Sequence, residues 1–136
     1  MSPRRPNPTD QLPEPTEAEL EVLRVLWQQG ECTVRQVHEI LSRGNPVAYT
    51  TVLTTLQIMH QKGLVKRDAS ERAHVYAAGL SQRRAQKRFL GKILDRVFEG
   101  SSAELVMQAL GSGRPATSDE LAMIRARLNE LEDKQK

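Results

Sequence analysis

Residues 48–63 have the sequence A-Y-T-T-V-L-T-T-L-Q-I-M-H-Q-K-G. On a helix, Val52, Leu56 and Met59 fall on one narrow face, which predicts packing against a hydrophobic core. The opposite face has no acidic residue and carries hydroxyl and amide side chains, namely Thr50, Thr54, Gln57 and Gln61. Such a face suits the base edges of the DNA major groove, because threonine and glutamine hydrogen-bond to bases. It suits an ordinary amphipathic helix as well, so this helix alone leaves both interpretations open.

Two helices are expected before this stretch, and each begins with a capping-box pattern. Thr16–Glu19 and Thr33–Gln36 both place a threonine three residues before Glu or Gln, so that each side chain satisfies a backbone donor. The first helix is expected to end at Gly30, and residues 31–33 to form a short extended link. The second helix closes before a turn at residues 43–46, which leads into the Thr- and Gln-rich helix. This order predicts a helix-turn-helix.

Two short alternating segments follow Gly63, a residue that suits a helix C-terminus. Residues 64–68 and 73–77 flank a polar four-residue turn, which predicts a β-hairpin. Three helices followed by a basic hairpin give a winged-helix arrangement, with the hairpin as the wing. Any exposed hairpin can carry basic residues, but those of the wing are placed to contact DNA phosphates: Lys66, Arg67, Arg72 and His74.

Charge is distributed unevenly along the 136 residues. The formal net charge is +3, yet residues 35–92 hold eleven Lys and Arg against three Asp and Glu. This places a positive field around the predicted helix-turn-helix, as expected of a protein that binds phosphates. A solvated basic surface would give the same counts, so charge alone does not decide the function.

Residues 81–136 predict three further amphipathic helices. In the last of them, apolar residues spaced by 3, 4 and 3 positions form an a/d seam typical of coiled coils. So short a segment can bury little apolar surface in a core of its own, and we expect its apolar faces to pack against a second copy of the chain. The alternative is that these helices fold back on their own domain. The expected homodimer interface comprises Leu90, Ile93, Leu94, Val97, Leu105, Leu121, Ile124, Leu128 and Leu131.

The predicted fold is therefore mainly α with a small β-hairpin. Residues 1–15 hold five of the seven prolines and are expected to form a disordered arm. Residues 16–80 are expected to form a winged helix-turn-helix DNA-binding domain. Residues 81–136 are expected to form a helical dimerisation domain.

Several classes of protein are excluded by what the sequence lacks. No apolar run of 18 residues and no signal-peptide segment is present, which predicts a cytoplasmic protein without membrane insertion. The single cysteine, Cys32, excludes an internal disulfide and a cysteine-cluster metal site, and is expected to be a buried apolar residue. The histidines form no zinc-protease pair, and no glycine-rich phosphate loop occurs. We therefore expect no enzymatic activity, no metal and no cofactor.

A combination of segments across residues 16–132 resembles a known family. The segments are Ala18-Glu19-Leu20-Glu21-Val22-Leu23, Leu26-Trp27, Thr33-Val34-Arg35-Gln36-Val37, Tyr49-Thr50-Thr51-Val52-Leu53-Thr54-Thr55-Leu56, Lys62-Gly63-Leu64-Val65 and Arg72-Ala73-His74-Val75-Tyr76. Together they resemble the penicillinase-repressor (BlaI/MecI/CopY-like) family of winged-helix transcriptional repressors. The resemblance implies a homodimer that binds an inverted-repeat operator in double-stranded DNA, with resistance or stress genes as expected targets.

The resemblance also implies which side chains contact DNA. In the family, the helix that matches residues 48–63 reads the major groove, so base contacts are implied for Thr50, Thr51, Leu53, Thr54 and Gln57. The wing and its flanking residues are the implied backbone contacts, namely Arg35, Tyr49, Lys62, Lys66, Arg67, Arg72 and His74. A winged helix that binds proteins without specific DNA binding is the alternative function.

Two regulatory devices of the family can be compared with this sequence. In its β-lactam-responsive members, a membrane sensor triggers proteolysis of an Asn-Phe bond in the C-terminal domain. The matching stretch here, residues 106–110, reads Val-Met-Gln-Ala-Leu. This stretch lacks the Asn-Phe dipeptide, so it is left open whether a sensor or an inactivating protease is a partner of this chain. Copper-sensing relatives carry a Cys-x-Cys tail, and no cysteine follows Cys32, which excludes copper sensing through that device.

Overall fold

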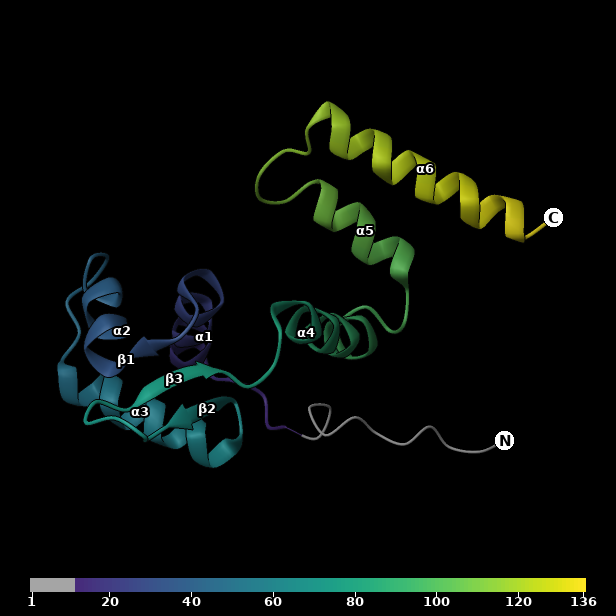
Figure 1. Cartoon of the computed structure of the whole chain (residues 1–136). Helices are drawn as coiled ribbons and strands as arrows, with labels where there is room; N and C mark the ends of the chain where they lie inside the picture. Colours follow the sequence, from purple (N-terminus) through teal and green to yellow (C-terminus); the bar gives the residue numbers. More distant parts are fainter. Residues whose placement is uncertain (1–11) are drawn as a thin grey trace, which may run out of the picture. The chain divides into compact units, whose positions relative to one another are not determined.

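The computed structural model describes residues 12–136, and the predicted disordered arm lies largely outside these residues. The described chain is mainly α-helical with a small antiparallel sheet, as predicted (Figure 1). It divides into two compact units, one ending at Phe89 and the other spanning Leu90–Lys136. The elements are α1 (Glu17–Gln29), β1 (Cys32–Thr33), α2 (Val34–Leu41), α3 (Tyr49–Lys62), β2 (Val65–Asp68), β3 (Val75–Ala78), α4 (Gln82–Arg96), α5 (Ser102–Leu110) and α6 (Ser118–Lys134).

The helix starts follow the capping signals in the sequence. Complete capping boxes begin α1 at Thr16, α2 at Thr33 and α6 at Thr117. At the start of α5, the Ser101 hydroxyl accepts from the Glu104 backbone N–H, which is one half of a capping box. Local hydrogen bonds therefore set where these four helices begin.

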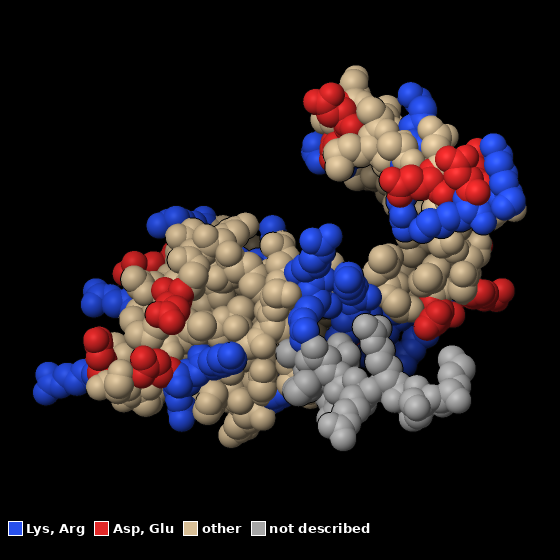
Figure 2. Space-filling model, turned by 45° about the vertical axis from the view of Figure 1, so that its right-hand side comes forward, with Lys and Arg blue, Asp and Glu red and all other residues tan. Residues whose placement is uncertain are grey.

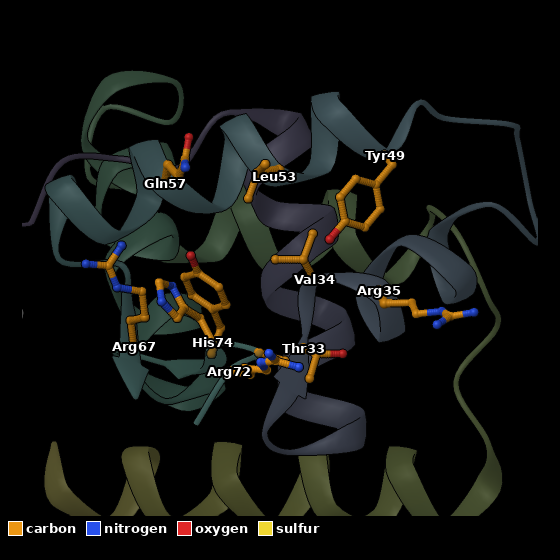
Figure 3. Close-up of a pocket in the computed structure, with 11 residues that line it drawn as sticks. Thr33, Val34, Arg35, Tyr49, Leu53, Gln57, Arg67, Arg72 and His74 are labelled. Atoms are coloured by element: carbon orange, nitrogen blue, oxygen red, sulfur yellow. The ribbon is translucent and has the colours of Figure 1, made fainter. Parts of the chain in front are cut away.

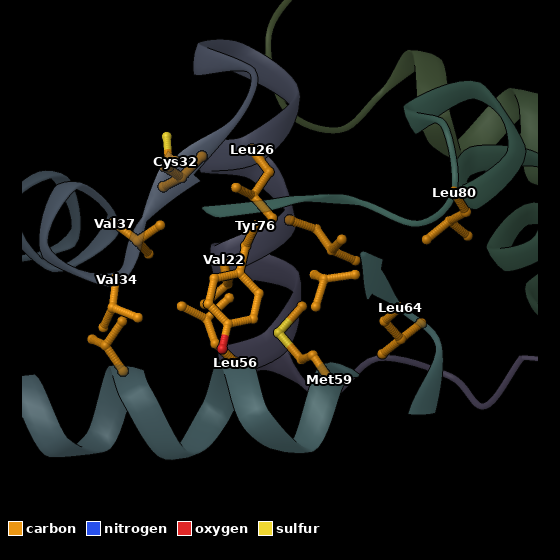
Figure 4. Packing of buried hydrophobic residues seen from close by; sticks show 14 of the residues in the cluster. Val22, Leu26, Cys32, Val34, Val37, Leu56, Met59, Leu64, Tyr76 and Leu80 are labelled. Carbon is orange, nitrogen blue, oxygen red and sulfur yellow. The ribbon is translucent and has the colours of Figure 1, made fainter. Parts of the chain in front are cut away.

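The core of the first unit lies between α1, α2, α3 and the sheet (Figure 4). The predicted core face of α3 is confirmed, since Val52, Leu56 and Met59 are at most 2% exposed. Cys32 is also buried, and burial raises the pKa of its thiol, which favours the apolar, unreactive role expected for it. The remaining buried hydrophobic residues are Val22, Leu23, Val25, Leu26, Val34, Val37, Leu64, Val65, Tyr76, Leu80 and Ala85.

The sheet has one strand more than the predicted hairpin. Its order is β1-β3-β2, and all neighbours are antiparallel. The sequence indicated only an extended link at residues 31–33, because two residues are too few to show alternation. In the structure, Cys32 pairs with Tyr76 and so joins the start of α2 to the hairpin.

The wing, residues 65–78, has a longer turn than predicted. Val75 pairs with Asp68, so the connection spans residues 69–74 rather than four residues. The Asp68 carboxylate accepts from the Ser70 backbone N–H at 2.9 Å, which turns the chain away from the strand immediately after Asp68. The prediction that a strand begins at residue 73 was therefore wrong, and His74 lies in the turn.

Glycines attach the wing to the end of α3. Gly63 ends α3 with a φ of +84°, a left-handed conformation that glycine adopts without strain. Gly79 donates its N–H to the Leu64 oxygen at 2.7 Å. A Cβ at Gly79 would lie 2.5 Å from the Gly63 oxygen, so only glycine allows this approach. The close contact fixes the base of the wing beside α3.

The second unit buries little of its apolar surface. Neither α5 nor α6 contains a buried residue. The helix α4 ends at Arg96, and the Gly100 N–H then bonds back to the Leu94 oxygen at 2.8 Å and closes a tight turn. Among the described residues, no helix is both long and apolar enough to span a membrane.

Candidate nucleic-acid interface

The outer face of α3 presents polar, uncharged side chains to solvent. Thr50, Thr51, Thr54 and Gln57 are exposed, whereas Leu53 is partly buried against the core. The helix places these residues on its outer face because Val52, Leu56 and Met59 occupy the inner one. Hydroxyl and amide groups on an accessible helix can hydrogen-bond to base edges.

A groove of about 610 Å³ runs between α3, the start of α2 and the wing. Figure 3 shows Tyr49, Leu53 and Gln57 along the α3 side, with side chains of the wing facing them. Seven residues predicted for DNA contact meet here, namely Arg35, Tyr49, Leu53, Gln57, Arg67, Arg72 and His74. The groove therefore unites base-reading and backbone-contacting candidates that lie far apart in the sequence.

The groove carries positive charge. Arg35, Arg67 and Arg72 line it, and none of its described lining residues is acidic. Arg35 lies 3.5 Å from Glu39, but both side chains are largely exposed, so this pair is weak. Figure 2 shows both basic and acidic side chains on the face of the first unit in view, and both signs also occur on α6. A cationic groove beside a neutral helix face suits a phosphate backbone next to base edges.

Other predicted contacts lie outside this groove. Lys66 is exposed on β2, but neighbouring strand residues face opposite sides, and only Arg67 lines the groove. Thr51 lines a second groove, of about 340 Å³, between α1 and α3. Thr50 and Thr54 are exposed and line neither groove.

Some lining residues were not among the predicted DNA contacts. Thr33, Val34, Ala73 and Tyr76 complete the groove wall. Thr33 was expected only to cap the second helix. Pairing of β1 with β3 brings the start of α2 against the wing, and a two-residue strand gives no pattern from which this pairing could be predicted.

Lys62, another predicted backbone contact, forms an ion pair across the fold. Its Nζ lies 2.8 Å from Oε1 and 3.0 Å from Oε2 of Glu19, whose side chain is 4% exposed. Burial alone would raise the pKa of Glu19. Hydrogen bonds from Lys62 Nζ and the Thr16 N–H outweigh burial and hold that pKa below its ordinary value. A phosphate would have to share the Lys62 ammonium with this carboxylate.

The ion pair predicts a pH-dependent stability. The pKa of Glu19 is lower in the folded state than in the unfolded state. The ionised carboxylate therefore stabilises the fold above about pH 4.5, and this stabilisation is lost as the pH falls through the folded pKa. Glu19→Gln is expected to lower the free energy of unfolding by about 1 to 3 kcal/mol at pH 7. Urea unfolding at several pH values should show this difference shrinking below pH 4.5.

The control for this experiment is Glu21→Gln. Glu21 lies 3.6 Å from Arg24, and both side chains are 59% exposed, so its loss should change stability little at any pH. If the difference in unfolding free energy between Glu19→Gln and the wild type stays constant down to pH 3, the charge of Glu19 does not stabilise the fold.

Residues 12–136 contain no group of at least three His, Cys, Asp or Glu side chains that could hold a metal ion. The site contains one histidine, His74, and three arginines. Its chemistry is that of anion binding and hydrogen bonding.

Comparison with known proteins adds relatives of this chain. The transcriptional regulator BlaI from two strains of Mycobacterium tuberculosis, CDC 1551 / Oshkosh and ATCC 25618 / H37Rv, is 51% identical over 57 residues. That match covers 41% of this chain and 41% of each relative, so the chain spans about two fifths of the length of the curated relatives it matches.

Two solved structures are also similar. The solution structure of the DNA-binding domain of the repressor BlaI is 26% identical, with 53% of this chain and 88% of that chain covered and a TM-score of 0.48. The second is the monomeric form of Bacillus licheniformis BlaI in complex with the blaP half-operator. It is 26% identical with the same coverage and a TM-score of 0.47.

A family model covers most of the chain. The model described as penicillinase repressor matches residues 15–130, a longer region than any single relative above. It describes repressors and not enzymes, in agreement with the prediction that the chain is not an enzyme. The resemblance predicted from the sequence is confirmed, and the chain belongs to the penicillinase repressor family.

Proposed function

We propose that this chain is a sequence-specific DNA-binding transcriptional repressor that acts as a homodimer on an inverted-repeat operator. The observation that carries the proposal is the groove in which the neutral face of α3 meets Arg67, Arg72 and Arg35. Membership of a repressor family supports the same function. Repression follows because a protein seated on the operator blocks access to the promoter.

In this proposal, α3 selects the sequence and the wing supplies affinity. Thr50, Thr54 and Gln57 offer hydrogen-bonding groups to the major groove, while Arg67 and Arg72 bind phosphates beside it. Phosphate contacts release counterions and act on any DNA, so they raise affinity without choosing a site. The side chains on α3 then distinguish the operator from other DNA.

The homodimer is part of the proposal because the second unit leaves apolar surface uncovered. Leu121, Leu128 and Leu131, on one seam of α6, are 42%, 50% and 43% exposed. Leu90 and Ile93 on α4 are 50% and 44% exposed, and Val97, just after this helix, is 68% exposed. So much exposed apolar surface is unfavourable in water and favours association. Two copies could then place their α3 helices on half-sites about one DNA turn apart.

We include an inactivating protease among the proposed partners that end repression. The stretch that matches the family's cleavage region lies within α5, where Val106 and Met107 are exposed. A protease acting there would produce fragments that end near Gln108 after exposure to an inducer. An intact chain on a blot during derepression would remove this partner from the proposal.

The function is tested by locating and titrating an operator. A footprint across the promoters next to the gene should reveal a protected inverted repeat. This duplex should bind much more tightly than random DNA of equal length, with affinity that falls steeply as salt rises. Equal affinity for both duplexes would contradict specific repression and favour a winged helix that binds other proteins.

Thr54→Ala tests the selecting role of α3. Thr54 is exposed on the outer face, so its loss should not disturb the core. We expect a loss of about 1 to 3 kcal/mol in operator binding and a relaxed preference at one base position in each half-site. Titration against operator duplexes mutated at single positions measures both. An unchanged preference would remove Thr54 from the base-reading set.

A further inference from the structure

The helix α3 begins without a side-chain cap. Of the six helices in residues 12–136, it alone starts at a residue, Ala48, whose side chain cannot accept a hydrogen bond. The other five begin with a Thr or Ser hydroxyl that accepts a backbone N–H of the first turn. An uncapped first turn frays more readily, so contacts from elsewhere must hold this end of α3.

His38, on α2, contacts both sides of this uncapped start. Its Nε2 lies 2.7 Å from the backbone oxygen of Val47, the residue just before Ala48. Since a carbonyl oxygen only accepts, Nε2 carries the proton and donates it. The same ring lies edge-on to Tyr49, the first residue of α3, with centroids 5.6 Å apart and an interplanar angle of 75°. Edge-to-face packing of this kind is favourable.

These contacts fix both the position and the direction of the first turn of α3. Val47 is partly buried against the core, so the bond from His38 fastens the connection between α2 and α3 to the body of the domain. Tyr49 is 46% exposed and lines the groove, so packing against His38 restricts where its ring can lie. His38 itself is partly buried and does not line the groove.

We propose that His38 is a positioning residue for sequence recognition, which sets the first turn of α3 and Tyr49 against the operator without contacting DNA itself. The inference rests on the proposed repressor function and deepens it. Hydrogen bonds to bases require accurate placement of the side chains that make them, whereas phosphate contacts tolerate small shifts. Loss of His38 should therefore reduce specific binding more than non-specific binding.

Two variants separate the two contacts of His38. His38→Phe keeps a ring beside Tyr49 and loses the donor to Val47. His38→Gln keeps an N–H donor and loses the ring. In titrations of the full chain, we expect His38→Phe to weaken binding to the footprinted operator by about tenfold, and His38→Gln by about threefold. Binding to a random duplex of equal length should be unchanged for both.

Trp27→Phe is the matched control. Trp27 Nε1 donates to the Leu80 oxygen at 3.0 Å, so this variant also loses a bond from a ring N–H to a backbone oxygen. Trp27 lies on α1 and does not line the groove. We expect its thermal midpoint to fall about as far as that of His38→Phe, with the preference for the operator over random DNA intact.

The outcomes distinguish this inference from the function on which it rests. If both His38 variants keep the wild-type ratio of operator to random affinity, or lose no more of it than Trp27→Phe does, the positioning role is overturned. His38→Gln keeps the test valid if His38→Phe does not fold. A wild-type chain that itself fails to prefer the operator would instead overturn the repressor function.

Discussion

Replacing Arg67 and Arg72 together by glutamine is expected to weaken operator binding by about 100-fold or more. Both arginines line the cationic groove beside α3, where a phosphate backbone would lie. A hydrogen bond to a charged group contributes about 1.5 to 3 kcal/mol, and a homodimer would lose two such residues in each copy. Both residues are exposed, so the fold should persist.

The salt dependence identifies the cause of this loss. Each phosphate contact removed should reduce the slope of log affinity against log salt by about 0.9. Because phosphate contacts carry no sequence information, random DNA should lose affinity in parallel. Fluorescence anisotropy over a range of salt concentrations measures the slope and both affinities.

The matched control removes two positive charges elsewhere. Arg24 and Arg114 pair with Glu21 and Glu120, are largely exposed, and do not line the groove. A double Arg24→Gln and Arg114→Gln variant should therefore bind the operator almost as the wild type does. If the two double variants bind equally well, the wing does not contact phosphates and the interaction-module alternative gains support.

Leu128→Glu is expected to convert the proposed homodimer into a monomer and to weaken operator binding by about 100-fold or more. Leu128 lies on the apolar seam of α6 and is 50% exposed in the single chain. A carboxylate there would be buried without a partner in the dimer, which is costly. Loss of the second copy also removes the advantage of binding two half-sites at once.

Sedimentation velocity and titration against one and two half-sites measure the two effects. Met123→Glu is the control, because Met123 is on the same helix, is 72% exposed, and lies off the seam of Leu121, Ile124, Leu128 and Leu131. This variant should remain dimeric. A Leu128→Glu protein that also remains dimeric would place the interface elsewhere.

The parts of the fold that depend on local signals could be predicted from the sequence. Capping threonines indicated α1 and α2, apolar spacing indicated α3, and the core face of α3 was correct to the residue. These features depend on neighbours within one helical turn, which the sequence displays directly. The alternation of apolar and polar residues predicted the wing, although its turn is longer than predicted because the Asp68 carboxylate ends the strand.

Contacts between distant residues could not be predicted in the same way. Glu19 was assigned only a capping role, but its carboxylate also binds Lys62, 43 positions later. Strand β1 and the contacts of His38 likewise depend on the folded arrangement of several elements. The types of side chain in the candidate site, and the helix face that carries them, could therefore be predicted from the sequence. Its groove wall and its supporting contacts emerged only from the structure.

Selection of duplexes from a random pool by the full-length chain tests the central claim most directly. A homodimer that reads bases through α3 should enrich an inverted repeat whose half-site centres lie about one helical turn apart. The enriched sequence should also occur in the promoter protected in the footprint. Recovery of a pool with no common sequence, or of single half-sites without a repeat, would contradict a homodimeric, sequence-specific repressor.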